Sequence, residues 1–438
     1  MEGCRSIWKE SIDIELPPFP GGVIDADVAV IGSGLGGLSA ALHVLHRHPG
    51  RNVIVLEADQ LGHGASSRSA GMVTPGVGQN LPGIIRRQGA ARARAMYDAT
   101  LRAVEYVGEF TAAHAIECQF RTSGQLVVAH GRSGRRRLAA LAAAYRQLEL
   151  PHDVFTDHEL SDRLRLAKRA PGDGPAGLRL PIAGVVNPGL LVSGLARSVQ
   201  QSGGRLYARA RVVEIGRGHP ARLAIAGGGE VRARDVIMAT SAYSETLGVQ
   251  RGRVIPMHLR VVLTAPLDDR QLGHLGWAGR EGVIDSRRIF NYFRLTEDRR
   301  VLFGGGVPVY RSGGASDERG GDVPSESLRQ QLAATFGDAL GLRIDRAWSG
   351  PIGYVLDTLP VIQRLKSHPA VVFVGGWCGH GIALSVTAGR WVADILEGTP
   401  PPPDLPWFRS SAPLVPFAAV RRLAVPAGSW GMSLLDKL

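Results

Sequence analysis

Three glycines near the start of the chain have the spacing of a phosphate-binding turn. Gly32, Gly34 and Gly37 follow the apolar run 28–31 and precede a stretch with leucines at helical spacing. In Gly-x-Gly-x-x-Gly the first glycine permits a tight turn, the second lets a pyrophosphate approach the backbone, and the third lets the helix pack on the strand. The helix start adds free N–H groups and a positive dipole end. The pattern predicts a dinucleotide-binding site.

A carboxylate stands where such a site needs one. Glu57 follows a second apolar run, 52–56, about twenty residues beyond Gly37. A carboxylate at this place accepts hydrogen bonds from the adenosine ribose, and it disfavours a 2′-phosphate, which arginine would bind better. The residues alone therefore indicate FAD or NAD and leave the choice between them open.

The elements that must position these residues form a strand–helix–strand unit over 27–57. Helices are predicted over 89–115, 132–150, 192–201, 325–340 and 382–397, and buried strands over 236–240 and 371–375. Residues 254–310 change to alternating strands (254–265, 288–295 and 301–309), which favours an antiparallel sheet. The predicted fold class is α/β: a Rossmann-like dinucleotide-binding domain with a parallel sheet, interleaved with an antiparallel-sheet α+β domain.

The interleaving predicts domains built from separate pieces. Residues 1–24 are predicted as an N-terminal arm and 401–438 as a proline-rich tail that packs on the surface. The remaining boundaries divide the chain between 25–80, 180–250 and 350–400 for the cofactor domain, and 81–179 and 251–349 for the substrate or cap domain.

The composition is that of a globular protein with excess arginine and glycine. The chain has 438 residues, 57 glycines and a formal charge of +12. Only four of its 51 basic residues are lysines, which points to a composition bias more than to a dedicated nucleic-acid surface. No basic run interleaved with aromatic residues occurs, so no nucleic-acid partner is predicted.

Cysteine usage and hydropathy suggest where the chain works. Cys4, Cys118 and Cys378 are isolated, so neither a disulfide framework nor a thiolate metal site is predicted. No metal is expected at the closely spaced His43, His46 and His48 either. The N-terminus lacks a secretory pattern and no 18-residue apolar run occurs. We expect a cytoplasmic protein without a membrane span, a monomer or homodimer.

Four further motifs carry a resemblance to a known family. They lie at 57–72, 292–306, 348–360 and 376–381, and the last contains Gly379-His380-Gly381. Together they resemble FAD-dependent amine and amino-acid oxidoreductases, the group of D-amino-acid oxidase, glycine oxidase and sarcosine oxidase. Within this group the motifs are most similar to those of gamma-glutamylputrescine oxidoreductase-like proteins. The resemblance spans nearly the whole chain and implies FAD with an antiparallel substrate domain.

The resemblance also implies which residues contact the cofactor. Val213 would meet the adenine through its backbone, the 66–72 segment would lie along the flavin, and the Gly-His-Gly turn would face its pyrimidine end. The implied cofactor-binding residues are Gly32, Gly34, Leu35, Gly36, Gly37, Glu57, Ala58, Ser66, Ser67, Arg68, Ala70, Gly71, Met72, Val213, Ala239, Thr240, Gly376, Gly379, His380, Gly381 and Ile382.

The residues at the family's linkage positions favour non-covalent FAD. Some relatives link flavin through a histidine, and the counterpart here is Arg68. Sarcosine oxidases use a cysteine close to the position of Gly353-Tyr354, and this chain has none there. Cys378 lies at a different place from that linkage.

In this family the flavin takes a hydride from the carbon beside a neutral amine, and the resulting imine hydrolyses. The resemblance therefore implies an amine or amino-acid substrate. The candidate catalytic residues are His380, Tyr292 and Tyr354, and the candidate substrate-binding residues are Arg68, His258, Asn291, Tyr292 and Tyr354. Each also fits a purely structural role: the tyrosines as half-buried aromatics and His258 as a polar strand residue.

The electron acceptor and two alternative functions stay open. Sarcosine oxidase activates O₂ with a lysine, and the corresponding stretch 299–302 has none. The acceptor is therefore O₂ or another oxidant. The alternatives are an FAD-dependent 2-hydroxy-acid dehydrogenase and the flavin domain of a nucleic-acid-modifying protein.

Overall fold

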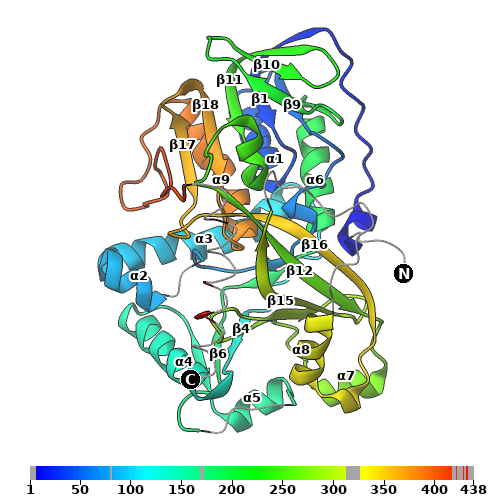
Figure 1. The fold of residues 1–438 in the computed structure, drawn as a ribbon, viewed down its shortest axis with the longest axis vertical. Helices are drawn as coiled ribbons and strands as arrows, with labels where there is room; N and C mark the ends of the chain where they lie inside the picture. The colour runs from blue at the N-terminus through cyan, green and yellow to red at the C-terminus, as the bar shows by residue number, and fades with distance from the viewer. Residues whose placement is uncertain are drawn as a thin grey trace.

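Two eight-stranded sheets with helices around them make up the molecule (Figure 1). The structure is a computed structural model and describes residues 6–78, 81–167, 172–311 and 326–416, with single residues at 421, 428, 431 and 432. The two sheets confirm the predicted fold class, one Rossmann-like layer and one antiparallel layer.

The first sheet has a parallel centre in the order β17-β18-β11-β1-β2-β8, and β10 and β9 extend it from β11. Its four parallel pairs are β1 with β11, β1 with β2, β11 with β18, and β2 with β8. Its strands are β1 (Val23–Ile31), β2 (Val53–Leu56), β8 (Arg205–Tyr207), β9 (Val212–Ile215), β10 (Ala221–Ile225), β11 (Glu230–Met238), β17 (Val361–Leu365) and β18 (His368–Gly375).

Helices cover one face of this sheet. Wholly apolar strands such as β2 need a cover on both faces. One face packs on α1 (Leu35–Arg47), α3 (Ala90–Ala113), α6 (Pro188–Gln201) and α9 (Gly381–Leu396) in a single core. The other face packs on the β9–β10 hairpin and on the chain near Val254 and Val355.

The second sheet has the order β16-β12-β15-β14-β13-β4-β6-β5. All its neighbouring strands are antiparallel except β13 and β4. Its strands are β4 (Gln125–Val128), β5 (Asp153–Phe155), β6 (Gly177–Leu180), β12 (Ile255–Thr264), β13 (Gly282–Asp285), β14 (Tyr292–Leu295), β15 (Val301–Tyr310) and β16 (Ile344–Tyr354). The helices beside it are α4 (Gly131–Gln147), α5 (Asp157–Arg163), α7 (Asp269–Leu275) and α8 (Glu326–Phe336).

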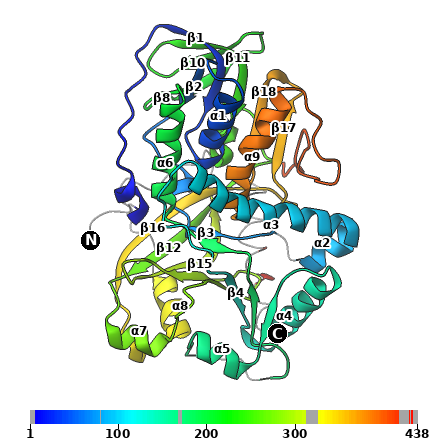
Figure 2. The same ribbon diagram turned by 180° about the vertical axis from the view of Figure 1, so that it is seen from behind.

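The boundary between the two sheets is crossed by several segments. Figure 2 shows α3 and α2 (Leu81–Gln88) running across the molecule between the sheets. Although 81–179 is predicted as part of the substrate domain, α3 packs against α9 in the first core. The pattern of α3 shows an apolar face without showing which sheet receives it. A two-stranded sheet, β3 (Met72–Val73) with β7 (Gly184–Val185), lies beside the boundary.

The described residues of the N-terminal arm and of the tail pack on the two sheets and their helices. A short 3₁₀ helix, η1 (Ile7–Ser11), lies near the level of the boundary (Figure 1). In the described part of the tail Trp407 is fully buried, and its carbonyl accepts a hydrogen bond from the Ile362 N–H at 2.9 Å. The Gly-, Ser- and Asp-rich composition of 311–324 predicts a loop, and this segment lies almost wholly outside the described residues.

Candidate active site

The glycine turn after β1 is too tight for any side chain at two of its positions. Gly32 has φ of +102°, and a Cβ at Gly37 would lie 2.0 Å from the Gly32 carbonyl oxygen. The same added atom would lie 3.2 Å from the Cβ of Ala239, so the end of β11 packs directly on the turn. No side chain caps α1 at Gly34. The turn therefore presents backbone N–H groups and a positive helix end, as a pyrophosphate requires.

The Glu57 carboxylate lies beside this turn at the end of β2. Its Oε2 accepts hydrogen bonds from the Ser33 N–H at 3.0 Å and the Ser33 hydroxyl at 2.6 Å. The Ala210 N–H donates to the Glu57 carbonyl at 2.7 Å, which brings the chain before β9 alongside. Val213 lies on β9 with a half-exposed side chain. The carboxylate is thus held at the position where an adenosine ribose would meet it.

A second helix N-terminus lies beside the first. Figure 1 shows α9 next to α1, and small residues let the helices meet closely. A Cβ at Gly36 would lie 3.7 Å from the Trp377 ring, and one at Gly389 would lie 2.3 Å from the Ser39 Oγ. His380 is the N-cap residue of α9, and its Nδ1 accepts a hydrogen bond from the Gly78 N–H at 3.2 Å. The predicted Gly-His-Gly turn is therefore next to the dinucleotide turn.

The 65–72 segment runs from the pyrophosphate turn toward the second sheet. It begins with η2 (Ala65–Ser67), and the Ser66 Oγ accepts a hydrogen bond from the Leu35 N–H at 3.1 Å. Ser67 is fully buried and its hydroxyl donates to the Gly62 carbonyl. The Arg68 guanidinium is also buried and donates to the His63 and Ser349 carbonyls. A Cβ at Gly282 would lie 2.7 Å from the Met72 Cε.

These residues fit FAD. The glycine-rich start of α1 and the Glu57 carboxylate suit its adenosine diphosphate half, because they supply backbone donors and an acceptor. The N-terminus of α9 lies beside that of α1, and its positive end would stabilise negative charge on the reduced flavin ring. Of the other predicted contacts, Thr240 is the residue before η3 (Ser241–Leu247) and makes no side-chain cap bond, Gly376 has φ of +78°, and Ile382 is buried in α9.

Tyr292 and Tyr354 lie on the same face of the second sheet. Strand pairing joins Tyr292 to Gly304, Gly304 to Val261 and Tyr354 to Ile255, and these partners share a face by strand alternation. A Cβ at Gly304 would lie 2.2 Å from the Tyr292 ring, so the glycine makes room for it. Tyr292 and Ala70 both pack against the apolar cluster that contains Trp8 and Trp348, which brings the Tyr292 end of this face near the 65–72 segment.

Asn291 and His258 are on the opposite face. Asn291 precedes Tyr292 on the chain, and its Oδ1 would lie 2.2 Å from a Cβ at Gly305. His258 alternates with Met257, which packs with Tyr354. The strand period of two residues therefore separates these two predicted substrate residues from the two tyrosines. A sequence pattern places these residues at strands but does not show the strand register, which decides the sheet face that each side chain occupies.

Burial keeps the candidate catalytic groups neutral. Desolvation lowers the pKa of His380 and raises the pKa of both Tyr292 and Tyr354. Burial is the only cause of the shift at Tyr292, while nearby Cys378 and Asp357 contribute at Tyr354. At neutral pH the imidazole and both phenols are therefore uncharged.

Both described cysteines are buried as free thiols. Burial raises the pKa of Cys378 to about 12 and that of Cys118 to about 11. The Cys378 sulfur accepts a hydrogen bond from the Val355 N–H at 3.1 Å. Within the described ranges no three His, Cys, Asp or Glu residues group as metal ligands, and no described helix has the length and apolar character to cross a membrane.

Three contacts to the 68–71 segment come from residues to which the sequence assigned no role: Trp8, Arg294 and Trp348. Arg294 and Trp348 lie in the motifs 292–306 and 348–360. Their neighbours in the sequence do not show that these side chains contact a backbone segment more than 200 positions away. An arginine between Phe293 and Leu295 has the pattern of a solvated strand residue, yet Arg294 is 1% exposed.

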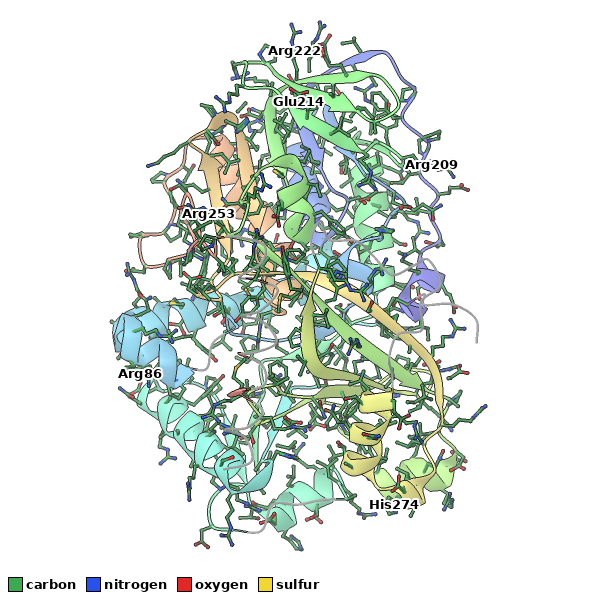
Figure 3. All side chains as sticks on the ribbon, in the orientation of Figure 1. Arg86, Arg209, Glu214, Arg222, Arg253 and His274 are labelled. Carbon is green, nitrogen blue, oxygen red and sulfur yellow. The ribbon has the colours of Figure 1, made fainter. Side chains whose placement is uncertain are left out.

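The arginine excess is spread over the molecule. Figure 3 labels Arg86, Arg209, Arg222 and Arg253, which lie on four separate parts of it. Other arginines pair with carboxylates, as Arg47 does with Asp394 at 2.7 Å and Arg135 with Asp157 at 2.7 Å. Part of the arginine excess therefore joins neighbouring elements through ion pairs.

A dinucleotide turn, a second helix start and an adjoining antiparallel sheet are the features expected of a flavin-dependent oxidoreductase. The chain belongs to the DAO family, the FAD-dependent oxidoreductases, whose model matches residues 27–395. The family membership confirms FAD as the cofactor and an oxidoreductase as the class of enzyme.

Relatives and solved structures agree with this. The chain is 30% identical to gamma-glutamylputrescine oxidoreductase of Escherichia coli K12 over 95% of this chain and 94% of the relative. It is 23% identical to glycine oxidase of Bacillus licheniformis over 85% of this chain and 94% of the relative. The crystal structure of glycine oxidase from Geobacillus kaustophilus superposes with a TM-score of 0.71 at 20% identity, covering 86% of this chain and 96% of that one.

Proposed function

We propose that the protein oxidises the C–N bond of an amine, with non-covalently bound FAD, to an imine that water then hydrolyses. When bound, FAD supplies the acceptor for the hydride that leaves the carbon beside the nitrogen. The observation that carries the proposal is the apolar sheet face at Tyr292, which shares one cluster with Ala70 of the 65–72 segment, with the neutral Tyr354 farther along the same face. The similarity to an amine oxidoreductase over nearly the whole chain supports it.

This surface favours the uncharged form of the amine. Burial in an apolar setting disfavours an ammonium ion, because a charge loses its hydration there. A neutral nitrogen has the lone pair that must assist departure of the hydride from the adjacent carbon. Tyr292 and Tyr354 would orient the substrate, and the neutral His380 would hold the Gly78 backbone beside the α9 helix start.

The state of Arg68 favours an amine over an α-amino acid. Recognition of a carboxylate needs an arginine with donors directed at it. Two donors of the buried Arg68 guanidinium go to the His63 and Ser349 carbonyls. We infer that Arg68 positions the loop and does not bind a substrate carboxylate.

The residues of the second sheet favour an acceptor other than O₂. The stretch 299–302, which the family resemblance matched to the oxygen-activating lysine, contains no lysine and ends in Leu302, which is fully buried among apolar residues. Leu302 supplies no cation for electron transfer to O₂, and the guanidinium of Arg294, its partner across the strand pair, donates to the Val186 and Gly71 carbonyls. We propose that an artificial electron acceptor reoxidises the enzyme faster than air does.

The test is anaerobic bleaching of the bound flavin by matched substrate panels. Primary and secondary amines, including acylated polyamines, should bleach the oxidised flavin absorbance faster than α-amino acids. Bleaching by 2-hydroxy acids alone would replace this proposal by the hydroxy-acid alternative. Retention of RNA at low salt, with steep salt dependence, would support the nucleic-acid alternative.

A further inference from the structure

The backbone carbonyls of residues 68–71 all receive hydrogen bonds from side chains that lie far away in the sequence. The Trp348 indole N–H donates to the Arg68 carbonyl at 3.0 Å. The Trp8 indole N–H donates to the Ser69 carbonyl at 2.9 Å. Three separate segments, η1, β14 and β16, thus converge on four consecutive peptide groups.

Arg294 completes the set with a single amino group. Its Nη1 contacts the carbonyls of Val186 at 2.7 Å, Gly71 at 3.0 Å and Ala70 at 3.3 Å. Two hydrogens serve three acceptors here, so the contact to Ala70 is the weakest. A Cβ at Gly71 would lie 2.7 Å from this Nη1 and 2.3 Å from the Val186 oxygen. Glycine at 71 is therefore needed for the arginine to reach the backbone.

The surroundings strengthen these bonds. Trp8 and Trp348 belong to one apolar cluster with Val261, Leu263 and Leu302, and hydrogen bonds gain strength where the local dielectric is low. The Arg294 guanidinium lies over the Trp8 indole at 5.4 Å and has no ion pair within 4.0 Å among the described residues. Burial lowers its pKa to about 10, so it still carries its charge at neutral pH.

The N-terminal arm is fastened to both domains around Trp8. Glu10 pairs with Arg346 on β16, and Asp13 pairs with Arg197 on α6. A Cβ at Gly189 would lie 2.0 Å from the Trp8 carbonyl oxygen, so the arm sits directly on the start of α6. This geometry fixes the indole against the segment instead of leaving it at the surface.

We propose that Trp8, Arg294 and Trp348 are positioning residues that hold the 68–71 segment in its flavin-binding conformation before FAD arrives. We call these three side chains the carbonyl clamp. In a trans peptide the N–H points opposite to the preceding carbonyl, so the clamp turns the N–H groups that follow away from itself. The clamp lowers the cost of ordering the segment on binding, and Arg294 adds a buried positive charge beside it.

The proposal rests on FAD binding, not on the identity of the substrate. Its test is the FAD dissociation constant of the apoprotein and the reduction potential of the holoprotein, measured with chemical reductants. Trp8→Phe and Trp348→Phe each remove one N–H and keep a ring. Each should weaken FAD binding about 3- to 10-fold, the loss expected for one hydrogen bond in an apolar setting.

The chain contains matched controls. Trp407 and Trp277 are buried tryptophans whose indole N–H has no acceptor among the described residues. Trp407→Phe and Trp277→Phe should leave FAD affinity and the reduction potential within twofold and within error, respectively. A fall in thermal stability without a change in affinity is the result expected for a purely structural indole.

Arg294 separates the effect of charge from that of hydrogen bonding. Arg294→Gln should weaken FAD binding and lower the reduction potential, because a neutral amide no longer favours the negative charge of reduced flavin. Arg294→Lys should restore most of the potential. If both arginine variants fail to fold, the two clamp tryptophans still decide the matter.

The proposal is overturned if Trp8→Phe and Trp348→Phe match the two control variants in FAD affinity and reduction potential. A wild-type protein that binds FAD but is bleached by no amine would end the proposed function and leave this test intact. The two ideas can therefore fail separately.

Discussion

The two ends of the cofactor site are built in different ways. The adenosine end lies within one strand–helix–strand unit, where Gly32, Gly37 and Glu57 are local in sequence. The flavin end joins η1, the 65–72 segment, β14, β16 and the start of α9. The residues of the adenosine end form one local sequence motif. The residues of the flavin end come together only when the whole chain has folded. This difference teaches where single substitutions should separate cofactor binding from turnover.

The largest effect is expected at the adenosine end. Gly37→Val places atoms where even a Cβ would lie 2.0 Å from the Gly32 oxygen, so the turn cannot keep its shape. We expect the FAD dissociation constant to rise by more than about 100-fold, equivalent to roughly 3 kcal/mol or more. The measurement is the flavin content of the purified protein and titration of the apoprotein.

Gly273→Val in α7 is the control for this change. An added Cβ there meets no atom within 4 Å, so flavin content should equal that of the wild type. If Gly37→Val takes up FAD as well as the control does, the turn is not the pyrophosphate site.

The free energy of unfolding should fall in acid because of a partly buried histidine between α1 and α3. His43 on α1 accepts a hydrogen bond from the Tyr106 hydroxyl at 2.7 Å and donates to the Ser39 carbonyl at 2.7 Å. Burial lowers its pKa from 6.5 to about 4. Because the unfolded chain binds the proton more readily, this contribution is complete above pH 6.5 and is lost as the pH falls toward 4.

The expected loss is at most about 3.5 kcal/mol, since each pKa unit corresponds to about 1.4 kcal/mol. Denaturant unfolding of the holoprotein between these pH values measures it. His43→Gln should flatten the dependence in this window. An equally steep dependence in that variant would assign the acid sensitivity to other groups.

A smaller effect is expected at the flavin end. Gly304→Ala adds a Cβ about 2.2 Å from the Tyr292 ring and should displace that ring. We expect kcat/KM for the best amine to fall about 10- to 30-fold, roughly 2 kcal/mol of misplacement. FAD affinity should stay within twofold. Steady-state kinetics and apoprotein titration separate the two readouts.

The result that would break the comparison is a parallel fall in FAD affinity and kcat/KM after Gly304→Ala. Tyr292 would then support the cofactor instead of the substrate. Gly273→Ala, also free of close contacts, controls for the addition of a methyl group.

The smallest effect is expected for the thiols. The raised pKa values of Cys118 and Cys378 leave little thiolate at pH 8. Alkylation of the native holoprotein should modify neither residue.

Acid precipitation of the holoprotein should release all the flavin into the supernatant, because we expect the FAD to be bound non-covalently. Flavin that stays with the precipitated chain would contradict non-covalent binding.

How far the sequence predicted the molecule follows from the same contrast. The turn at Gly32–Gly37, Glu57 and the layered fold were predictable because local spacing encodes them. The face of each strand was not, so Asn291 and His258 were grouped with Tyr292 although the sheet lies between them. Trp8 was missed because an indole in an N-terminal arm gives no sign of its acceptor.

The domain boundaries show a similar limit. The apolar face of α3 was visible in its periodicity, but the partner that buries it was not. The segment 205–215 forms two strands, β8 and β9, joined through Arg209 with φ of +51°. A left-handed backbone conformation at a residue other than glycine interrupts the strand, and no glycine or proline in the sequence indicates the break.

The central claim, oxidation of an amine C–N bond, is tested most directly by an isotope measurement on the reductive step. The best amine of the anaerobic panel is compared with the same amine carrying deuterium on the carbon beside the nitrogen. We predict that bleaching of the flavin slows several-fold with the deuterated amine and that one imine-derived carbonyl forms per flavin reduced. Bleaching that yields no carbonyl product, or that requires a hydroxy acid in place of the amine, would contradict the account.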